Sequence, residues 1–263
     1  MVIPVGYGLN CEDETGYGFE MVGAKVDRVF IKDLTEKPHI LEDYQILAMV
    51  GGFSFGDHIA AGKVLANIYK FKLGMDIYKF IDDGKLIFAE CNGFQTLVKA
   101  GILPGFEGDY RTQRATLTYN VSGVFEDRWV RLKVNTKSSC VFTRGLEELN
   151  LPVRHGEGKF VLGNNSDLQK LRDGNQIVLQ YADKQKLPTM SYPQNPNGSV
   201  EAIAGVCDPT GRVFGKMPHS TAYLSPYNHP HWTRVKAERS LPKEGEGVQV
   251  LRNAVEYARR NLT

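Results

Sequence analysis

Short apolar runs that alternate with helical segments constrain the fold of this chain most. Four runs rich in apolar residues lie at 2–5, 25–31, 45–50 and 85–89. Helical patterns occupy much of the chain between them, at 12–24, 58–71 and 75–84. Short apolar runs are typical of strands that are covered on both faces. The order therefore predicts βαβ units and a mostly parallel sheet, with functional groups in the turns at the carboxyl ends of its strands.

The pattern changes after residue 110, where strand-like segments follow one another. They lie at 110–142, 159–163, 176–182 and 201–215, and the last contains an Asp-Pro-Thr-Gly turn. We expect these segments to be antiparallel strands added to the core sheet. The fold class is therefore α/β, and 263 residues are enough for one large domain with a substantial core.

The end of the chain, residues 225–263, is predicted to be a C-terminal extension of this single domain, 1–263. It contains Pro and His residues and ends in a helical stretch at 247–262. The spacing of that stretch gives one apolar face, formed by Val248, Leu251, Val255 and Ala258. We expect this face to dock on the domain rather than to bind a partner.

Charge and cysteine content exclude several classes of partner. The chain has 32 basic and 30 acidic residues and a net charge of +2, so it lacks the positive field that binds nucleic acid or an anionic membrane. Its four cysteines form no CxxC pair, which indicates reduced thiols. The start of the chain does not resemble a signal peptide, and no segment is long and apolar enough to span a bilayer. We therefore expect a soluble, cytoplasmic protein.

One cysteine lies at a corner between a buried strand and a helix. In the segment LIFAECNGFQ, residues 86–95, Cys91 ends an apolar run and a helical pattern begins at Asn92. A sharp strand-to-helix turn exposes its corner side chain and requires small flanking residues, here Ala89 and Gly93. The first N–H groups of the helix would lower the pKa of the thiol and stabilise an oxyanion. Cys91 is thus a candidate nucleophile; the alternative is a small apolar residue buried at a strand end.

A thiol nucleophile also requires a base, and the best placed of the six histidines is His219. It follows an apolar strand and a proline in the segment VFGKMPHST, so a loop can bring it to the nucleophile. His229 and His231 lie two residues apart, but no third ligand is recognisable near them. We therefore expect no metal site and interpret this pair as loop residues.

Six motifs, in order along the chain, resemble one known family. They are GLNCEDET at 8–15, GGFSFGDHIAAGKVLA at 51–66, CNGFQTLVKAGILPG at 91–105, FEDRWV at 125–130, HGEGKF at 155–160 and NPNGSVEAIAGVCDPTGRVFGKMPH at 195–219. Together they resemble the glutamine amidotransferase subunits of phosphoribosylformylglycinamidine synthases, enzymes of purine biosynthesis, in a longer form of that subunit. The resemblance runs from residue 1 to about residue 224.

The resemblance implies a class I glutamine amidotransferase with a flavodoxin-like, three-layer fold. Cys91 would attack the side-chain amide of L-glutamine, giving a glutamyl thioester and ammonia, with His219 as the base. A separate synthase subunit would use the ammonia, with ATP and Mg²⁺, to convert formylglycinamide ribonucleotide to the amidine. No cofactor is expected in this subunit. The synthase subunit is the expected partner, and a small accessory subunit is left open.

The same resemblance places further site residues. The backbone N–H groups of Gly52, Phe53 and Asn92 would form the oxyanion hole, since glycines allow a close approach of the backbone. Gln95 resembles the position that contacts glutamine in the family. The alternatives are a plain tight turn at 51–52 and a solvent-facing residue on the helix for Gln95.

One departure from the family bears on catalysis. The family usually has Pro-Glu after the histidine, and that glutamate completes a Cys-His-Glu triad, whereas this chain has Ser220 and Thr221. Thr221 can accept a hydrogen bond from the His219 ring as a weaker substitute, so we expect reduced but measurable glutaminase activity. One alternative is a catalytically impaired structural or regulatory subunit of the synthase. Another is a different cysteine hydrolase on a related sheet.

Overall fold

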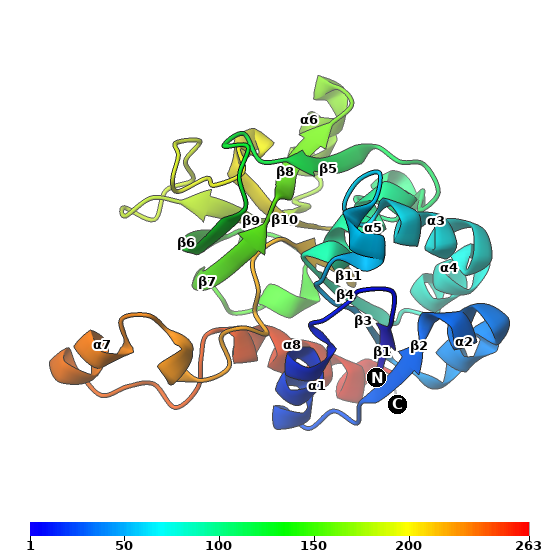
Figure 1. The fold of residues 1–263 in the computed structure, drawn as a ribbon, viewed down its shortest axis with the longest axis horizontal. Helices are drawn as coiled ribbons and strands as arrows, with labels where there is room; N and C mark the ends of the chain where they lie inside the picture. Colours follow the sequence, from blue (N-terminus) through cyan, green and yellow to red (C-terminus); the bar gives the residue numbers. More distant parts are fainter. Residues whose placement is uncertain (263) are drawn as a thin grey trace.

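A large mixed sheet forms the centre of the molecule (Figure 1). Over residues 1–262, which the computed structural model describes, nine strands join this sheet. In spatial order they are β2 (Asp27–Phe30), β1 (Val2–Val5), β3 (Ile46–Met49), β4 (Leu86–Glu90), β11 (Val213–Lys216), β10 (Ile203–Cys207), β9 (Ile177–Ala182), β6 (Glu126–Val134) and β7 (Glu148–His155).

The sheet has a parallel half and an antiparallel half. Strands β2, β1, β3, β4 and β11 are parallel to one another, whereas β10, β9, β6 and β7 are added in antiparallel pairing. The predicted α/β class, with antiparallel strands added to a parallel core, is therefore confirmed. The expectation that the whole 201–215 segment is antiparallel was wrong for β11, which pairs in parallel with β4 and belongs to the parallel half. The sequence pattern did not predict β7, because it contains a proline, which is tolerated here since β7 is the edge strand of the sheet.

Two strands that were expected in the core sheet lie outside it. Strands β5 (Ala115–Tyr119) and β8 (Glu157–Leu162) pair with each other as a separate two-stranded sheet. The expectation that every strand after residue 110 joins the core was wrong in this respect. The small sheet includes most of the 155–160 segment and lies close to α5 (Asn92–Ala100), the helix that follows Cys91.

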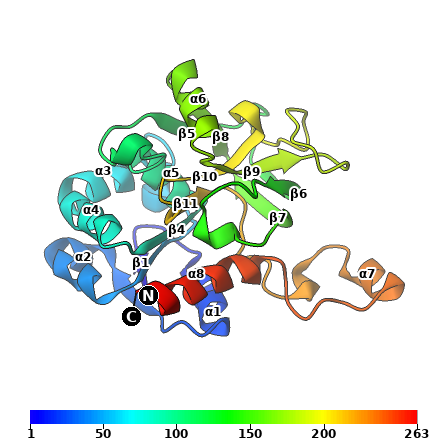
Figure 2. The same ribbon diagram turned by 180° about the vertical axis from the view of Figure 1, so that it is seen from behind.

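Helices cover both faces of the parallel half (Figures 1 and 2). One face carries α1 (Glu12–Met21) and α8 (Gly247–Asn261), and the other carries α2 (Ile31–Glu36), α3 (Lys63–Lys72), α4 (Gly74–Asp82) and α5 (Asn92–Ala100). Helix α6 (Asn165–Asp173) follows β8. The arrangement is the three-layer order expected for a doubly covered parallel sheet. No helix in the described part of the chain is long and apolar enough to cross a membrane.

The C-terminal segment behaves as two parts. The four residues predicted to form the apolar face of α8 are buried, and α8 lies beside α1. Helix α7 (Trp232–Glu238) has no buried residue and projects from the body in both views. The last helix of the extension is thus packed on the domain, whereas α7 is not.

The helix expected at 58–71 begins later than predicted. Helix α3 starts at Lys63, and its N-cap is Gly62, with a φ of 72°. Asp57 and Ile59 both have positive φ, so the chain between them is an irregular turn rather than the first turn of a helix.

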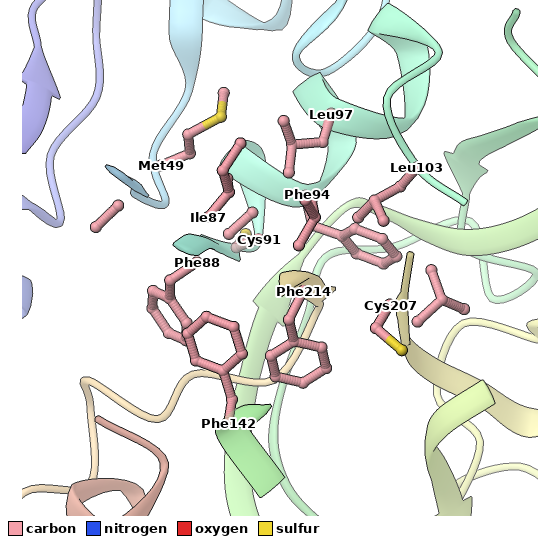
Figure 3. Packing of buried hydrophobic residues seen from close by; sticks show 14 of the residues in the cluster. Met49, Ile87, Phe88, Cys91, Phe94, Leu97, Leu103, Phe142, Cys207 and Phe214 are labelled. Carbon is pink, nitrogen blue, oxygen red and sulfur yellow. The ribbon is translucent and has the colours of Figure 1, made fainter. Parts of the chain in front are cut away.

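Aromatic packing fixes the end of β4. Phe88 packs against Phe19 of α1 with ring centroids 5.7 Å apart, and against Phe142 with centroids 5.8 Å apart. Figure 3 shows helix α5 on one side of the strand that ends at Cys91 and three aromatic rings on the other, those of Phe88, Phe142 and Phe214. Since dense packing leaves little room for adjustment, this core holds the corner at Cys91 in place.

The corner itself has the strained geometry that the sequence predicted. Cys91 has a φ of 52° and a ψ of −109°, a conformation that side chains other than glycine rarely adopt. A Cβ atom on Gly93 would lie 2.0 Å from the carbonyl oxygen of Met49 in β3. Glycine at this position therefore lets the start of α5 lie directly against the neighbouring strand.

Replacing Gly93 by alanine should destabilise the protein by about 1–3 kcal/mol or more, because the added methyl group overlaps backbone that cannot move alone. Urea unfolding of Gly93→Ala measures this loss. Gly74→Ala is the matched control, since its Cβ would meet only Tyr78, at 3.5 Å, and we expect a change within about 0.5 kcal/mol. Equal stability of the two variants would contradict the close contact between α5 and β3.

Candidate active site

Three strand ends bring the predicted nucleophile and base together. Cys91 follows β4, His219 lies just beyond β11, and Gly51 lies just beyond β3. A Cβ atom built on Gly51 would lie 3.1 Å from Cε1 of His219, 3.4 Å from Cβ of Cys91 and 3.0 Å from Sγ of Cys11. The side chains of Cys91 and His219, 128 positions apart in the sequence, therefore both border Gly51 at the carboxyl end of the sheet, although the described residues show no hydrogen bond between the thiol and the ring.

The thiol of Cys91 is almost enclosed. Its side chain is 6% exposed, and Sγ lies 3.6 Å from the carbonyl oxygen of Arg154, to which it donates. Burial raises the pKa of the thiol to about 12, and the nearby Glu90 carboxylate acts in the same direction. The N–H groups of Asn92 and Gly52 oppose this shift but do not overcome it. The prediction that the corner lowers the pKa of Cys91 was therefore wrong for the site without substrate.

The backbone N–H groups of Asn92 and Gly52 both act to lower the pKa of the Cys91 thiol, which places them near its sulfur. Their function as an oxyanion hole stays a prediction. The N–H of Phe53 instead donates to the carbonyl oxygen of Gly8 at 2.9 Å. The assignment of Phe53 to the oxyanion hole was wrong, because this bond holds the turn after β3 against the Gly-rich loop after β1.

His219 is buried and neutral. Its side chain is 3% exposed, and neither ring nitrogen has a hydrogen-bond partner among the described residues. Burial lowers the pKa of the imidazole to about 4, although Glu90 acts in the opposite direction. Its main-chain N–H donates to the carbonyl oxygen of Pro152 at 2.7 Å, which fixes the loop that carries the ring. At neutral pH the ring can therefore accept a proton.

A carboxylate that the sequence analysis missed lies beside this imidazole. Oε1 of Glu90 is 3.6 Å from Nδ1 of His219, and Oε2 accepts a hydrogen bond from the N–H of Ser220 at 2.7 Å. Thr221 donates its hydroxyl proton to Oε1 of Glu90 at 2.5 Å. The prediction that Thr221 accepts a hydrogen bond from His219 was thus wrong in geometry, since its hydroxyl is directed at the carboxylate.

Glu90 is paired with a buried lysine. Its carboxylate forms a salt bridge with Lys216, which also donates to the carbonyl oxygen of Pro218 at 2.6 Å. Burial alone would raise the pKa of Glu90, but Lys216, His219 and the hydrogen bonds outweigh it and hold the pKa below its usual value. The carboxylate beside His219 is therefore ionised at neutral pH.

The sequence did contain a signal for this pair. Glu90 and Lys216 are opposite charges at the ends of two apolar runs, and the parallel register of β4 and β11 places them directly opposite each other. Fully buried charges are rare unless they are paired.

Gln95, in the first turn of α5 after Cys91, lies inside the protein. Its side chain is 3% exposed and donates to the carbonyl oxygen of Glu157 at 2.5 Å, while its oxygen accepts from Asn92 at 3.2 Å. The alternative of a solvent-facing residue is therefore excluded. Contact of Gln95 with a bound glutamine stays a prediction.

A second buried ion pair links the 155–160 segment to helix α5. Nζ of Lys99 lies 3.2 Å from Oε2 of Glu157, and Oε1 of Glu157 accepts from the N–H of Ala61 at 3.0 Å. Both side chains are buried. The motif HGEGKF thus joins the small β5–β8 sheet to α5 and to the turn before α3.

The histidine pair in the C-terminal extension has a packing function. The ring of His229 lies 4.8 Å from that of Trp129 and 5.8 Å from that of Tyr223. Within residues 1–262, no group of three or more His, Cys, Asp and Glu side chains is arranged to hold a metal ion. His229 therefore anchors the base of the projecting segment.

Comparisons with known proteins agree with this geometry. A family model described as a CobB/CobQ-like glutamine amidotransferase domain matches residues 1–258. Phosphoribosylformylglycinamidine synthase subunit PurQ of Dehalococcoides mccartyi is 46% identical over 253 residues, covering 96% of this chain and 95% of that protein. PurQ of Methanococcus maripaludis strain S2 is 39% identical over 264 residues, covering 98% and 96%. A chain in the structure of PurLQS from Thermotoga maritima has a TM-score of 0.71 and 28% identity, with 97% of each chain covered. The resemblance inferred from the six motifs is confirmed.

The raised pKa of Cys91 predicts slow alkylation of the isolated subunit. Because reaction with iodoacetamide requires the thiolate, the rate at pH 7.5 should be roughly a thousandfold below that of the same cysteine in the urea-unfolded chain. It should then rise about tenfold per pH unit up to pH 10. Mass spectrometry of the peptide that contains Cys91 measures both rates. A rate that is already on a plateau at pH 7 would indicate a preformed thiolate and would contradict the neutral thiol.

Proposed function

Because the chain belongs to the CobB/CobQ-like glutamine amidotransferase family and is similar to PurQ subunits over nearly its whole length, we propose that it is the glutaminase subunit of a phosphoribosylformylglycinamidine synthase. It hydrolyses L-glutamine to glutamate and ammonia. A separate synthase subunit then uses the ammonia in the ATP-dependent amidation of formylglycinamide ribonucleotide, in de novo purine biosynthesis. One observation carries this proposal: Cys91, His219 and the backbone N–H groups of Gly52 and Asn92 lie close together at the carboxyl ends of the parallel strands.

The first half-reaction forms a thioester. Sγ of Cys91 attacks the carboxamide carbon of glutamine, and the thiol proton passes to Nε2 of His219, the ring nitrogen that faces away from Glu90. Charge develops on the amide oxygen, which the N–H groups of Gly52 and Asn92 stabilise. The tetrahedral intermediate then expels its nitrogen, which takes the proton from His219 and leaves as ammonia.

The second half-reaction returns the site to its starting state. Water attacks the carbonyl carbon of the glutamyl thioester and gives one proton to Nε2 of His219. The intermediate collapses, the carbon–sulfur bond breaks, and His219 returns its proton to the sulfur. Glutamate leaves with the oxygen of water in its side-chain carboxylate, so each turnover consumes one water molecule and moves no net charge onto the protein.

The resting protonation state fits this sequence of transfers. Burial holds the thiol protonated and the imidazole neutral, so the proton moves during the attack rather than before it. A neutral pair costs less in a dry pocket than a thiolate beside an imidazolium. The site therefore reacts only slowly with other electrophiles, whereas a substrate amide held against Gly52 and Asn92 is attacked.

The alternative of a catalytically impaired subunit depended on the absence of a carboxylate after His219. Since Glu90 supplies a carboxylate 3.6 Å from Nδ1 of that ring, the absence does not favour this alternative. We infer that the working unit is a complex with the synthase subunit in the cytoplasm, that ATP and Mg²⁺ are used by the synthase, and that this chain holds no cofactor. Four free cysteines are in keeping with a reducing compartment.

Glutamate release by the chain together with its synthase subunit tests the proposal. Cys91→Ser should reduce the rate of release about a thousandfold or more, because a hydroxyl group is a much weaker acid and nucleophile than a thiol. Cys140→Ser is the matched control: this cysteine is also buried but lies outside the site, and its variant should keep the wild-type kcat. A wild-type rate no higher than that of Cys91→Ser would contradict a glutaminase.

A further inference from the structure

We propose that Glu90 is the carboxylate that positions His219 during catalysis, in place of the acid that the family usually carries two residues after the histidine. The proposal rests on the proposed function, since it assigns a partner to the same catalytic base. It makes Glu90 a positioning residue, because its carboxylate touches His219 and not the substrate. Nucleophile and acid would then be consecutive residues of one strand end.

The placement of Glu90 supports this function. Among the described residues, Glu90 is the only carboxylate within salt-bridge distance of His219, at 3.6 Å from Nδ1. A hydrogen bond between these atoms requires about 2.9 Å. A small approach of the ring as it takes up a proton closes this gap, and the charge of the imidazolium favours that approach.

Ser220 and Thr221, which stand where the family usually has Pro-Glu, both donate hydrogen bonds to the carboxylate of Glu90. Ser220 donates its N–H to Oε2, and Thr221 donates its hydroxyl proton to Oε1. In the usual arrangement the loop after the histidine carries the acid. Here the strand carries the acid and the loop carries the donors that hold it. Ser220, Thr221 and Glu90 are all buried, so water does not compete for these bonds.

Lys216 allows the carboxylate to remain charged in this position. Moving an unpaired carboxylate into the interior would favour its protonated form, which could not stabilise an imidazolium. Lys216 neutralises the charge at Oε2, whereas His219 lies beside Oε1. The second bond of Lys216, to the carbonyl oxygen of Pro218, fixes the turn that leads to the histidine. Arg154 and Asp127 are the other charged groups that act on His219, and they act in opposite directions.

A purely structural function of the pair is the competing explanation. A buried ion pair contributes little net stability compared with apolar residues of similar size, although removal of one partner is strongly destabilising. Stability measurements alone would not distinguish the two functions. Kinetic measurements would, because a positioning residue changes kcat and the pH dependence of a folded enzyme.

The experiment compares variants in the complex with the synthase subunit. Glu90→Gln removes the charge and keeps the size. Glu90→Gln combined with Lys216→Met removes both charges, so it remains informative if Glu90→Gln alone does not fold. Asp208→Asn is the matched control: this buried carboxylate accepts the N–H groups of Arg212 and Val213 before the start of β11, away from the site.

In both Glu90 variants kcat for glutamine hydrolysis should fall about 30-fold or more, with KM changed less than about threefold. The acid limb of the pH profile of kcat/KM should move to lower pH, because the carboxylate that raises the pKa of His219 is gone. Asp208→Asn should lower the melting temperature and leave kcat and the pH profile unchanged. Thr221→Glu should give no gain over the wild type, since an acid is already present.

Two results would overturn the inference and leave the proposed function intact. One is a folded Glu90→Gln/Lys216→Met variant with wild-type kcat and an unshifted acid limb. The other is a rise of tenfold or more in kcat for Thr221→Glu, which would show that the wild-type site lacks its carboxylate. A wild-type complex without glutaminase activity would instead refute the proposed function itself.

Discussion

The parallel pairing of β4 with β11 is the interaction on which the site depends. Its register sets Glu90 opposite Lys216, and the N–H of Cys91 donates to the carbonyl oxygen of Lys216 at 2.9 Å. His219 lies three residues beyond Lys216, so the same register also sets the approach of thiol and imidazole. A slip of one residue would reverse the facing of every side chain on one strand and would separate both pairs.

Burial explains how a reactive cysteine is kept inert. The enclosure that raises the pKa of Cys91 and lowers the pKa of His219 leaves both groups uncharged. The charge that remains in the pocket is concentrated in the Glu90–Lys216 pair, where each member compensates the other. In the proposed mechanism, positive charge on the imidazole is stabilised by the Glu90 carboxylate, and negative charge on the substrate oxygen is stabilised by the N–H groups of Gly52 and Asn92. Dipoles that are already in place cost nothing to reorganise during the reaction.

The sequence predicted what depends on local pattern and missed what depends on pairing between distant strands. Apolar runs predicted the parallel strands, and the small residues around Cys91 predicted its strained corner, because both effects act within a few residues. The partner of His219 could not be found from the residues that follow it, since the acid comes from a strand 129 positions earlier in the chain. The direction of the thiol pKa was also missed, because the helix N-terminus was weighed without the burial that only the folded chain reveals.

A high-resolution crystal structure of the complex, with Cys91 alkylated by a glutamine-like diazo-ketone, tests the central claim most directly. We expect the carbonyl oxygen of the adduct to accept hydrogen bonds from the N–H groups of Gly52 and Asn92. We also expect Nδ1 of His219 to lie about 2.7–3.0 Å from a carboxylate oxygen of Glu90. A ring whose Nδ1 bonds to another group, with Glu90 directed only at Lys216, would contradict the account.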